Sequence, residues 1–185
     1  RQLPYEKPLA TMRTYVEAMN ASMYTSVGPD EPPPTVLAAL GPKMLALAAE
    51  TTAGAHPYWT TPEHTAAARD VMGPDALLCV EQKVVHTTDA AVAHDVTRQQ
   101  LGKYAALPNY RNNWKRLGFT DEEIDDRAPR FLDAVMAWGD VDMIAERIQA
   151  HYDAGATHVC IQPIDPEQFG RPDWNLLEAL APQRG

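Results

Sequence analysis

The stretch that decides the fold reads VLAALGPKMLALAAE, residues 36–50. Residues 36–40 are a continuous apolar run between Pro34 and Gly41, which is typical of a fully buried parallel strand. A Gly-Pro turn follows, and residues 43–52 read as a helix that tolerates Pro42 in its first turn. A buried strand followed at once by a helix is one βα unit of a parallel α/β sheet.

The same alternation recurs along the chain. Further strands are expected at 54–59, 77–86 and 157–162. Helices are expected at 8–20, 61–72, 89–107, 140–155 and 173–180. Residues 108–138 read as a helical insertion that contains a capping box from Thr120 to Glu123. The prolines between 29 and 34 predict an exposed connector.

Strands separated by helices of this length predict parallel pairing with right-handed crossovers. A complete (β/α)8 TIM barrel takes about 250 residues, whereas four βα units, a leading helix and one insertion account for all 185 residues here. We therefore expect a single α/β domain, 1–185, that forms half of such a barrel, with two open sheet edges and an exposed apolar inner face. The start at Arg1 rather than Met fits a chain joined midway. A four-stranded doubly wound fold is the alternative, but no Gly-rich dinucleotide turn is present.

Composition narrows the function. The net charge of −9 makes the chain a poor nucleic-acid binder. No apolar run approaches the length of a membrane span and no signal peptide is visible, so a cytoplasmic location is expected. Cys79 and Cys160 lie in apolar runs and are expected to be small buried residues rather than a disulfide. His56 and His64 lack a carboxylate that would complete a metal site, so no metal is expected.

Several segments together carry a family resemblance. They are 37–50, Gly54-Ala55-His56-Pro57-Tyr58-Trp59, Thr61-Pro62-Glu63-His64-Thr65, Glu81-Gln82-Lys83-Val84-Val85, Asn109-Tyr110-Arg111-Asn112-Asn113-Trp114, Gly155-Ala156-Thr157-His158-Val159 and Gln162-Pro163, with Tyr5-Glu6-Lys7-Pro8-Leu9 at the start. The chain resembles luciferase-like monooxygenases, and more narrowly the actinobacterial deazaflavin-dependent oxidoreductases within that family. The match covers nearly the whole chain and maps it onto strands five to eight, the C-terminal half of the barrel. Ala53-Gly54 stands where the family often has Asp-Gly, and the first half of the barrel is missing.

The resemblance implies a cofactor that carries a phosphate, either coenzyme F(420) or, as the alternative, FMN. A helix N-terminus preceded by glycine is a ready site for a phosphate, because free N–H groups and the helix dipole favour an anion there. We expect the cofactor-binding residues to be Ala39, Leu40, Gly41, Pro42 and Lys43. Without the resemblance, an ordinary βα turn would explain this segment equally well.

Substrate-pocket residues are expected at the ends of the next two strands, where active sites of this fold lie. They are His56, Tyr58, Trp59 and Glu81. A period of two places Glu81 and Lys83 on one face of their strand, and that face is expected to be the barrel interior. Alternatively, these residues have a structural role, packing the end of the strand against the next helix or filling the barrel interior. The segment around Asn109–Trp114 is either a lid over the active site or a surface excursion.

The resemblance implies an oxidoreductase that transfers hydride between the cofactor and a small organic substrate, and a homo-oligomer or pairing with the missing half-barrel. The catalytic residues of the family come mostly from early strands, so none is identified in this chain. The alternative is a non-catalytic half-barrel that self-associates or binds a partner. A small α/β hydrolase is disfavoured because no Gly-x-Ser-x-Gly elbow exists.

Overall fold

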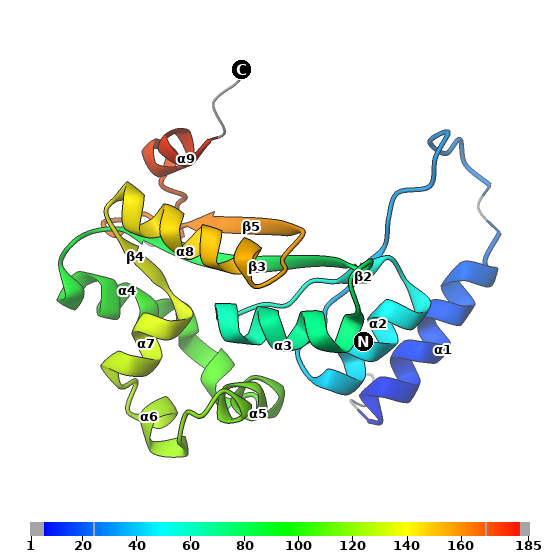
Figure 1. Ribbon diagram of the computed structural model, residues 1–185, viewed down its shortest axis with the longest axis horizontal. Helices are drawn as coiled ribbons and strands as arrows, with labels where there is room; N and C mark the ends of the chain where they lie inside the picture. Colours follow the sequence, from blue (N-terminus) through cyan, green and yellow to red (C-terminus); the bar gives the residue numbers. More distant parts are fainter. Residues whose placement is uncertain (1–5, 24, 169, 182–185) are drawn as a thin grey trace.

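The computed structural model describes residues 6–23, 25–168 and 170–181, so Arg1 and Tyr5 lie outside the described residues. Its helices and strands alternate as the sequence predicts (Figure 1). The elements are α1 (Pro8–Ala21), β1 (Val36–Leu37), α2 (Pro42–Thr51), β2 (Gly54–Ala55), α3 (Pro62–Met72), β3 (Leu77–His86), α4 (Ala90–Leu101), the 3-10 helix η1 (Gly102–Ala106), α5 (Pro108–Arg116), α6 (Asp121–Asp125), α7 (Pro129–Val135), β4 (Ala137–Gly139), α8 (Val141–Asp153), β5 (His158–Pro163) and α9 (Trp174–Leu180).

Four strands lie side by side in chain order, all parallel. β1 pairs with β2, β2 pairs with the start of β3, and β5 pairs with β3 from Cys79↔His158 to Val84↔Pro163. Consecutive parallel neighbours joined through helices are the arrangement of (β/α)8 barrel strands. The sheet is therefore that of a partial parallel barrel, as the sequence predicts.

The fifth strand was not expected. β4 pairs in parallel with the end of β3, starting at Val84↔Ala137, and its first two residues belong to the segment 108–138, which is expected to be helical. Its three residues are too few to show the alternation of apolar and polar positions by which a strand is recognised in a sequence.

β1 and β2 are shorter than expected, with two residues each instead of 36–40 and 54–59. The β2 ladder ends just before Pro57, which has no N–H to donate. The backbone nevertheless stays aligned, because His56 N donates to Leu37 O at 2.7 Å and Glu81 N donates to Pro57 O at 3.1 Å. The segment after β2 is thus held against both neighbouring strands.

The predicted helix starts are confirmed. Thr61 and Asp140 cap α3 and α8 through their side chains, and Thr120 and Glu123 form the predicted capping box. The helix expected at 89–107 is divided: α4 stops at Gly102, whose φ of 40° lies in the left-handed region. A short 3-10 turn then leads into α5.

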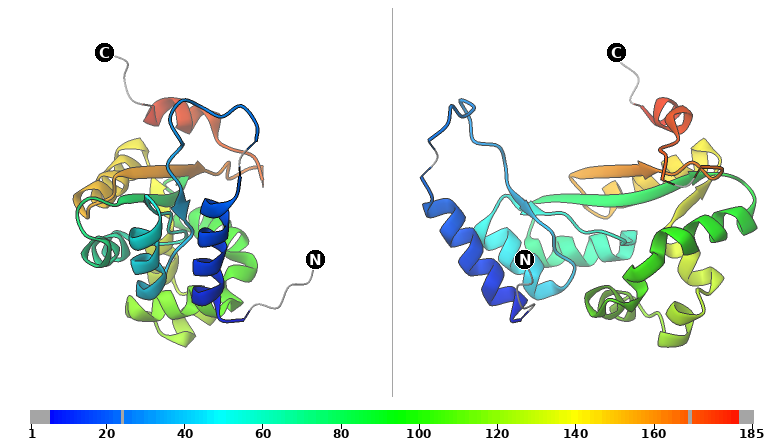
Figure 2. Two further views of the ribbon diagram at one scale, coloured as in Figure 1. Left: turned by 90° about the vertical axis from the view of Figure 1, so that its right-hand side faces the viewer. Right: turned by 180° about the vertical axis from the view of Figure 1, so that it is seen from behind.

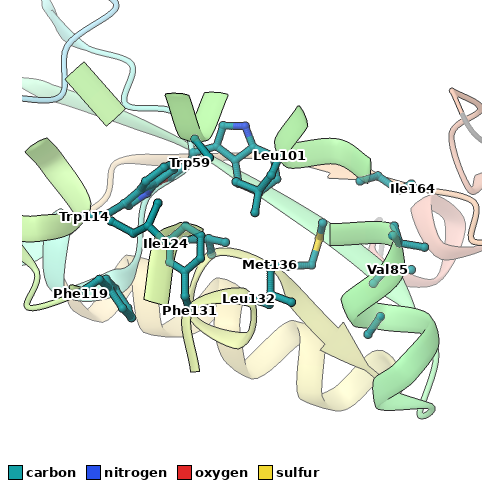
Figure 3. Packing of buried hydrophobic residues seen from close by; sticks show 14 residues of the cluster. Trp59, Val85, Leu101, Trp114, Phe119, Ile124, Phe131, Leu132, Met136 and Ile164 are labelled. Atoms are coloured by element: carbon teal, nitrogen blue, oxygen red, sulfur yellow. The ribbon is translucent and has the colours of Figure 1, made fainter. Parts of the chain in front are cut away.

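The two faces of β3 pack against different parts of the chain. Leu78 and Val80 belong to a core with residues of α2 and α3, and Val84 packs with Ile144 of α8. Val85, whose side chain points the opposite way, joins a core built around Trp114 and other residues of the segment 108–138 (Figure 3). In Figure 1 the helices α4 to α7 gather at one end of the sheet, away from α1 and α2. The expected insertion is therefore packed against the end of β3.

The inner face remains open at β5. His158, Cys160 and Gln162 are exposed on alternate positions of this strand. The expectation of an apolar inner face is wrong at this edge, because the open positions carry an imidazole, a thiol and an amide. The expectation that both cysteines are buried is also wrong, because Cys160 is exposed and Cys79 only partly buried; both thiols are free rather than joined in a disulfide. The strand around Cys160 is apolar on one face only, and the thiol lies on the other.

The proline-rich connector is exposed throughout residues 25–35, as predicted, and it projects away from the sheet (Figure 2). Among the helices that the structure describes, none has the length and apolar character needed to cross a membrane.

Candidate functional site

The N-terminus of α2 opens onto a hollow in the surface. No side chain caps it, and Met44 N and Leu45 N both donate to Gly41 O at 3.0 Å. Gly41 has an extended backbone (φ −83°, ψ 154°), so the turn itself does not require glycine. A Cβ at this position would first meet the Arg116 guanidinium, at 3.7 Å. The missing side chain thus leaves the space between the helix end and Arg116 free.

Two cations flank this helix end. A hollow of about 390 Å³ is lined by Pro8, Leu9, Gly41, Pro42, Lys43, Met44 and Arg116. The two cations are Lys43 and Arg116, and the described lining includes no carboxylate, although the net charge of the chain is −9. Arg116 was missed in the sequence because it lies on α5, more than 70 positions from Gly41, and only the tertiary fold brings the two together. The site favours an anion both through the helix dipole and through these charges.

An adjoining cleft of about 230 Å³ joins the helix end to the exit of β2. It is lined by Pro8, Ala38, Ala39, Leu40, Gly41, Met44, His56, Tyr58, Asn109 and Tyr110. The structure therefore places five of the predicted site residues around one cleft, and Pro42 and Lys43 around the hollow beside it. Trp59 and Glu81 do not line the cleft; both are almost completely buried behind it. Asn109 and Tyr110 come from α5, so part of the segment 108–138 borders the cleft.

Two histidines are fixed by backbone carbonyls here: His56 lines the cleft, and His64 contacts the backbone of Leu40, which lines it. The His56 ring nitrogen Nδ1 lies 2.6 Å from Cys79 O, so this nitrogen carries a proton and donates it. His64 Nε2 lies 2.9 Å from Leu40 O and donates in the same way, while its Nδ1 is buried with no hydrogen-bond partner. Burial lowers the pKa of His64, so its ring is neutral. Among the described residues, no three His, Cys, Asp or Glu side chains stand close enough together to hold a metal ion.

Behind the cleft, Lys83 is the centre of a buried polar network. Its Nζ donates to Glu81 Oε1 at 2.9 Å, to Tyr58 Oη at 2.6 Å and to Gln162 Oε1 at 2.5 Å, which uses all three ammonium hydrogens. Burial raises the pKa of Glu81 and lowers that of Lys83, and the attraction between the two charges opposes both shifts. Glu81 and Lys83 share one face of β3, as the period of two predicts.

Aromatic rings enclose this ammonium. Lys83 Nζ lies 4.0 Å from the Tyr58 ring centroid and 4.6 Å from that of Trp59. Tyr104 contacts Tyr58 with ring centroids 5.8 Å apart, and Tyr110 contacts Tyr104 at 5.1 Å. Burial is the main reason why the pKa of the Tyr58 hydroxyl is raised, and it raises that of Tyr110 to about 12. Both hydroxyls are therefore protonated near neutral pH.

Trp59, the residue after Tyr58, has a strained backbone conformation that contacts from other elements hold in place. Its φ of 57° lies in the left-handed region, which is unfavourable for a bulky residue. Glu81 Oε2 accepts from Trp59 N at 3.2 Å, and Trp114 Nε1 donates to Trp59 O at 3.0 Å. The turn that directs Tyr58 toward the cleft is thus fixed from β3 on one side and from α5 on the other. No signal in the sequence identified this strain, since it follows from contacts between distant elements.

A solved structure that aligns with most of this chain has a similar fold. An F(420)-dependent secondary alcohol dehydrogenase in complex with an F(420)-acetone adduct superposes with a TM-score of 0.61 at 14% identity, over 87% of this chain and 58% of that one. A coenzyme F(420)-dependent tetrahydromethanopterin reductase from Methanopyrus kandleri aligns over 69% of this chain and 44% of that one, at 17% identity and a TM-score of 0.43. The first likeness shows the fold, and this chain spans little more than half of that enzyme's length. No protein-family model and no curated protein matches the sequence.

Proposed function

We propose that this chain provides the cofactor-phosphate site and part of the substrate pocket of a luciferase-like oxidoreductase that uses coenzyme F(420). The reaction would be hydride transfer between the deazaflavin and a small organic substrate. The observation that carries the proposal is the cation-flanked, uncapped N-terminus of α2 opening into a cleft lined by His56 and Tyr58. The likeness to an F(420)-dependent dehydrogenase supports the choice of cofactor over FMN.

The residues present fit the phosphate-bearing end of such a cofactor. The free space over Gly41 and the positive charges of Lys43 and Arg116 favour the negatively charged phosphate group of such a cofactor. When bound, the deazaflavin supplies the ring that gives or takes the hydride, and the protein binds and orients it. Ala39 and Leu40 would line the approach to the phosphate, and His56 and Tyr58 would face the remaining part of the cleft.

Cofactor binding tests this proposal directly. The purified chain is titrated with oxidised F(420) and, separately, with FMN, and the cofactor fluorescence is followed. We expect saturable binding of F(420), weakened about tenfold by Lys43→Gln or Arg116→Gln, as is reasonable for losing one charge-assisted contact of about 1.4 kcal/mol. Arg98→Gln is the matched control, because Arg98 is an exposed arginine on α4 that lines neither hollow.

A specific observation also favours the second candidate, a non-catalytic half-barrel. Among the described strands β5 pairs only with β3, so its other edge is open, and alternate residues of β5 are exposed on one face. If neither cofactor binds and the chain sediments as a defined dimer, the oxidoreductase proposal fails and self-association is the better account.

A further inference from the structure

We propose that Tyr58 is the proton-transfer residue of this site and that Lys83 is the positioning residue that controls its hydroxyl. This inference rests on the proposed hydride-transfer function. Hydride transfer requires a proton to move as well, and the contacts of these two side chains and the position of Tyr58 at the cleft suit them to that task.

The Tyr58 side chain lies between the cleft and the buried Lys83. Tyr58 lines the same cleft as Gly41 and His56, so it borders the space next to the expected phosphate site. Behind it, the hydroxyl oxygen accepts a hydrogen bond from Lys83 Nζ at 2.6 Å. The hydroxyl hydrogen points toward Gln162 Oε1 at 3.2 Å, a long and weak contact that a ligand atom can replace.

Lys83 is held close to the Tyr58 hydroxyl by its other contacts. Its side chain is 3% exposed, and Glu81 and Gln162 occupy its other two N–H groups. Glu81 is itself held by the backbone N–H of Trp59, the residue next to Tyr58. The ammonium is therefore kept at a fixed distance from the Tyr58 oxygen, where its positive charge counteracts the rise that burial imposes on the pKa of this hydroxyl.

Tyr58 supplies the proton that must follow the hydride. When bound, a reduced cofactor would supply the hydride with its electron pair to an electrophilic carbon of the substrate, and the adjacent oxygen would then carry negative charge. The O–H bond of Tyr58 breaks and a new O–H bond forms at that substrate oxygen. An N–H proton of Lys83 then returns to the phenolate, and water reaching the exposed Gln162 side of the network restores the ammonium. Oxidation of an alcohol runs through the same steps in reverse.

The experiment replaces Tyr58 with a fluorinated tyrosine, whose more acidic hydroxyl titrates in the accessible pH range, and follows it by fluorine NMR. The pKa of this residue is compared between the unchanged chain and Lys83→Met, and Glu81→Gln/Lys83→Met shows how much of the change comes from the carboxylate left behind. Loss of the ammonium is expected to raise the pKa by one unit or more. The same label at Tyr152, an exposed residue of α8, is the control and should not respond.

Oxidised F(420) is then added to the labelled chain. Binding is expected to shift the fluorine signal at position 58 and not at 152, because Tyr58 lines the cleft and Tyr152 is an exposed residue of α8. A pKa change below about 0.3 units on removing Lys83 overturns the inference, and so does cofactor binding without any change at position 58. Absence of binding instead overturns the proposed function, while the titration still decides whether Lys83 controls the hydroxyl.

Discussion

Lys83 Nζ lies 2.9 Å from Glu81 Oε1, and the two side chains are 3% and 1% exposed. A buried ion pair of this kind contributes little net stability but is costly to break, because the remaining partner stays buried without a counter-charge. The pair sits between the cleft and the core, where it fixes Tyr58 on one side and the Trp59 backbone on the other. The main effect of this ion pair is therefore to fix the positions of Tyr58 and Trp59 rather than to add stability.

Removing one partner of this pair should destabilise the chain more than removing both. We expect Lys83→Met to lower the free energy of unfolding by about 3 kcal/mol or more. The double variant Glu81→Gln/Lys83→Met should recover much of that loss, since no buried carboxylate is then left alone. Urea denaturation at pH 7 measures both, and equal losses in the single and the double variant would contradict this account.

Gly54 is required by the close approach of two strands. A Cβ at this position would lie 1.8 Å from Leu77 O, a backbone atom that cannot move without breaking the register of β2 against β3. Gly54→Ala should therefore cost more than about 3 kcal/mol, beyond the usual range for a single substitution, or prevent folding. Gly41→Ala is the matched control, because its Cβ meets only a side chain at an ordinary 3.7 Å. Circular dichroism melts of the two variants should differ clearly.

His151 makes the stability of the chain sensitive to acid. Its ring is fully buried, with Nδ1 2.8 Å from Thr65 Oγ1 and Nε2 2.9 Å from Gln82 Oε1. Burial lowers its pKa to about 4, below the value of about 6.5 in an unfolded chain. As the pH falls from about 6.5 to about 4, the unfolded state binds a proton that the folded state refuses, so stability is lost within this window.

The expected loss from His151 is about 3 kcal/mol at most, from a shift of roughly 2.5 units. His151→Gln removes the titrating ring, and its free energy of unfolding should depend less steeply on pH between 6.5 and 4 than that of the unchanged chain. Denaturant titrations at several pH values give both slopes. Parallel slopes would mean that the imidazole is not buried in neutral form.

Local signals made much of this fold predictable. The caps at Thr61, Thr120 and Asp140 act within four residues of the chain, and their helices begin where expected. The parallel order of the strands also followed from their alternation with helices. β4 could not be predicted, because three residues are too few to show a periodic pattern. The exposed face at Cys160 could not be predicted either, because it depends on what lies opposite the strand.

The candidate site was predictable in part, for a similar reason. The Gly-Pro turn before a helix and the period of two at Glu81 and Lys83 are local patterns, and the structure places these residues beside one cleft or directly behind it. The position of Arg116 near Gly41 and the left-handed backbone of Trp59 arise from contacts between elements far apart in sequence. Such contacts leave no trace in the spacing of residues.

The thiol of Cys160 reports whether another polypeptide covers the open face of β5. In this chain alone it is exposed, whereas Cys79 is partly buried and burial raises the pKa of its thiol. Iodoacetamide should therefore alkylate Cys160 much faster than Cys79, as mass spectrometry of timed digests would show. Cys160→Ser is the control that identifies the fast site. If Cys160 is instead protected in the native chain and becomes reactive on dilution, a second copy covers the sheet edge. Protection that persists at every dilution would mean that the face is closed within a single chain, contrary to the structure.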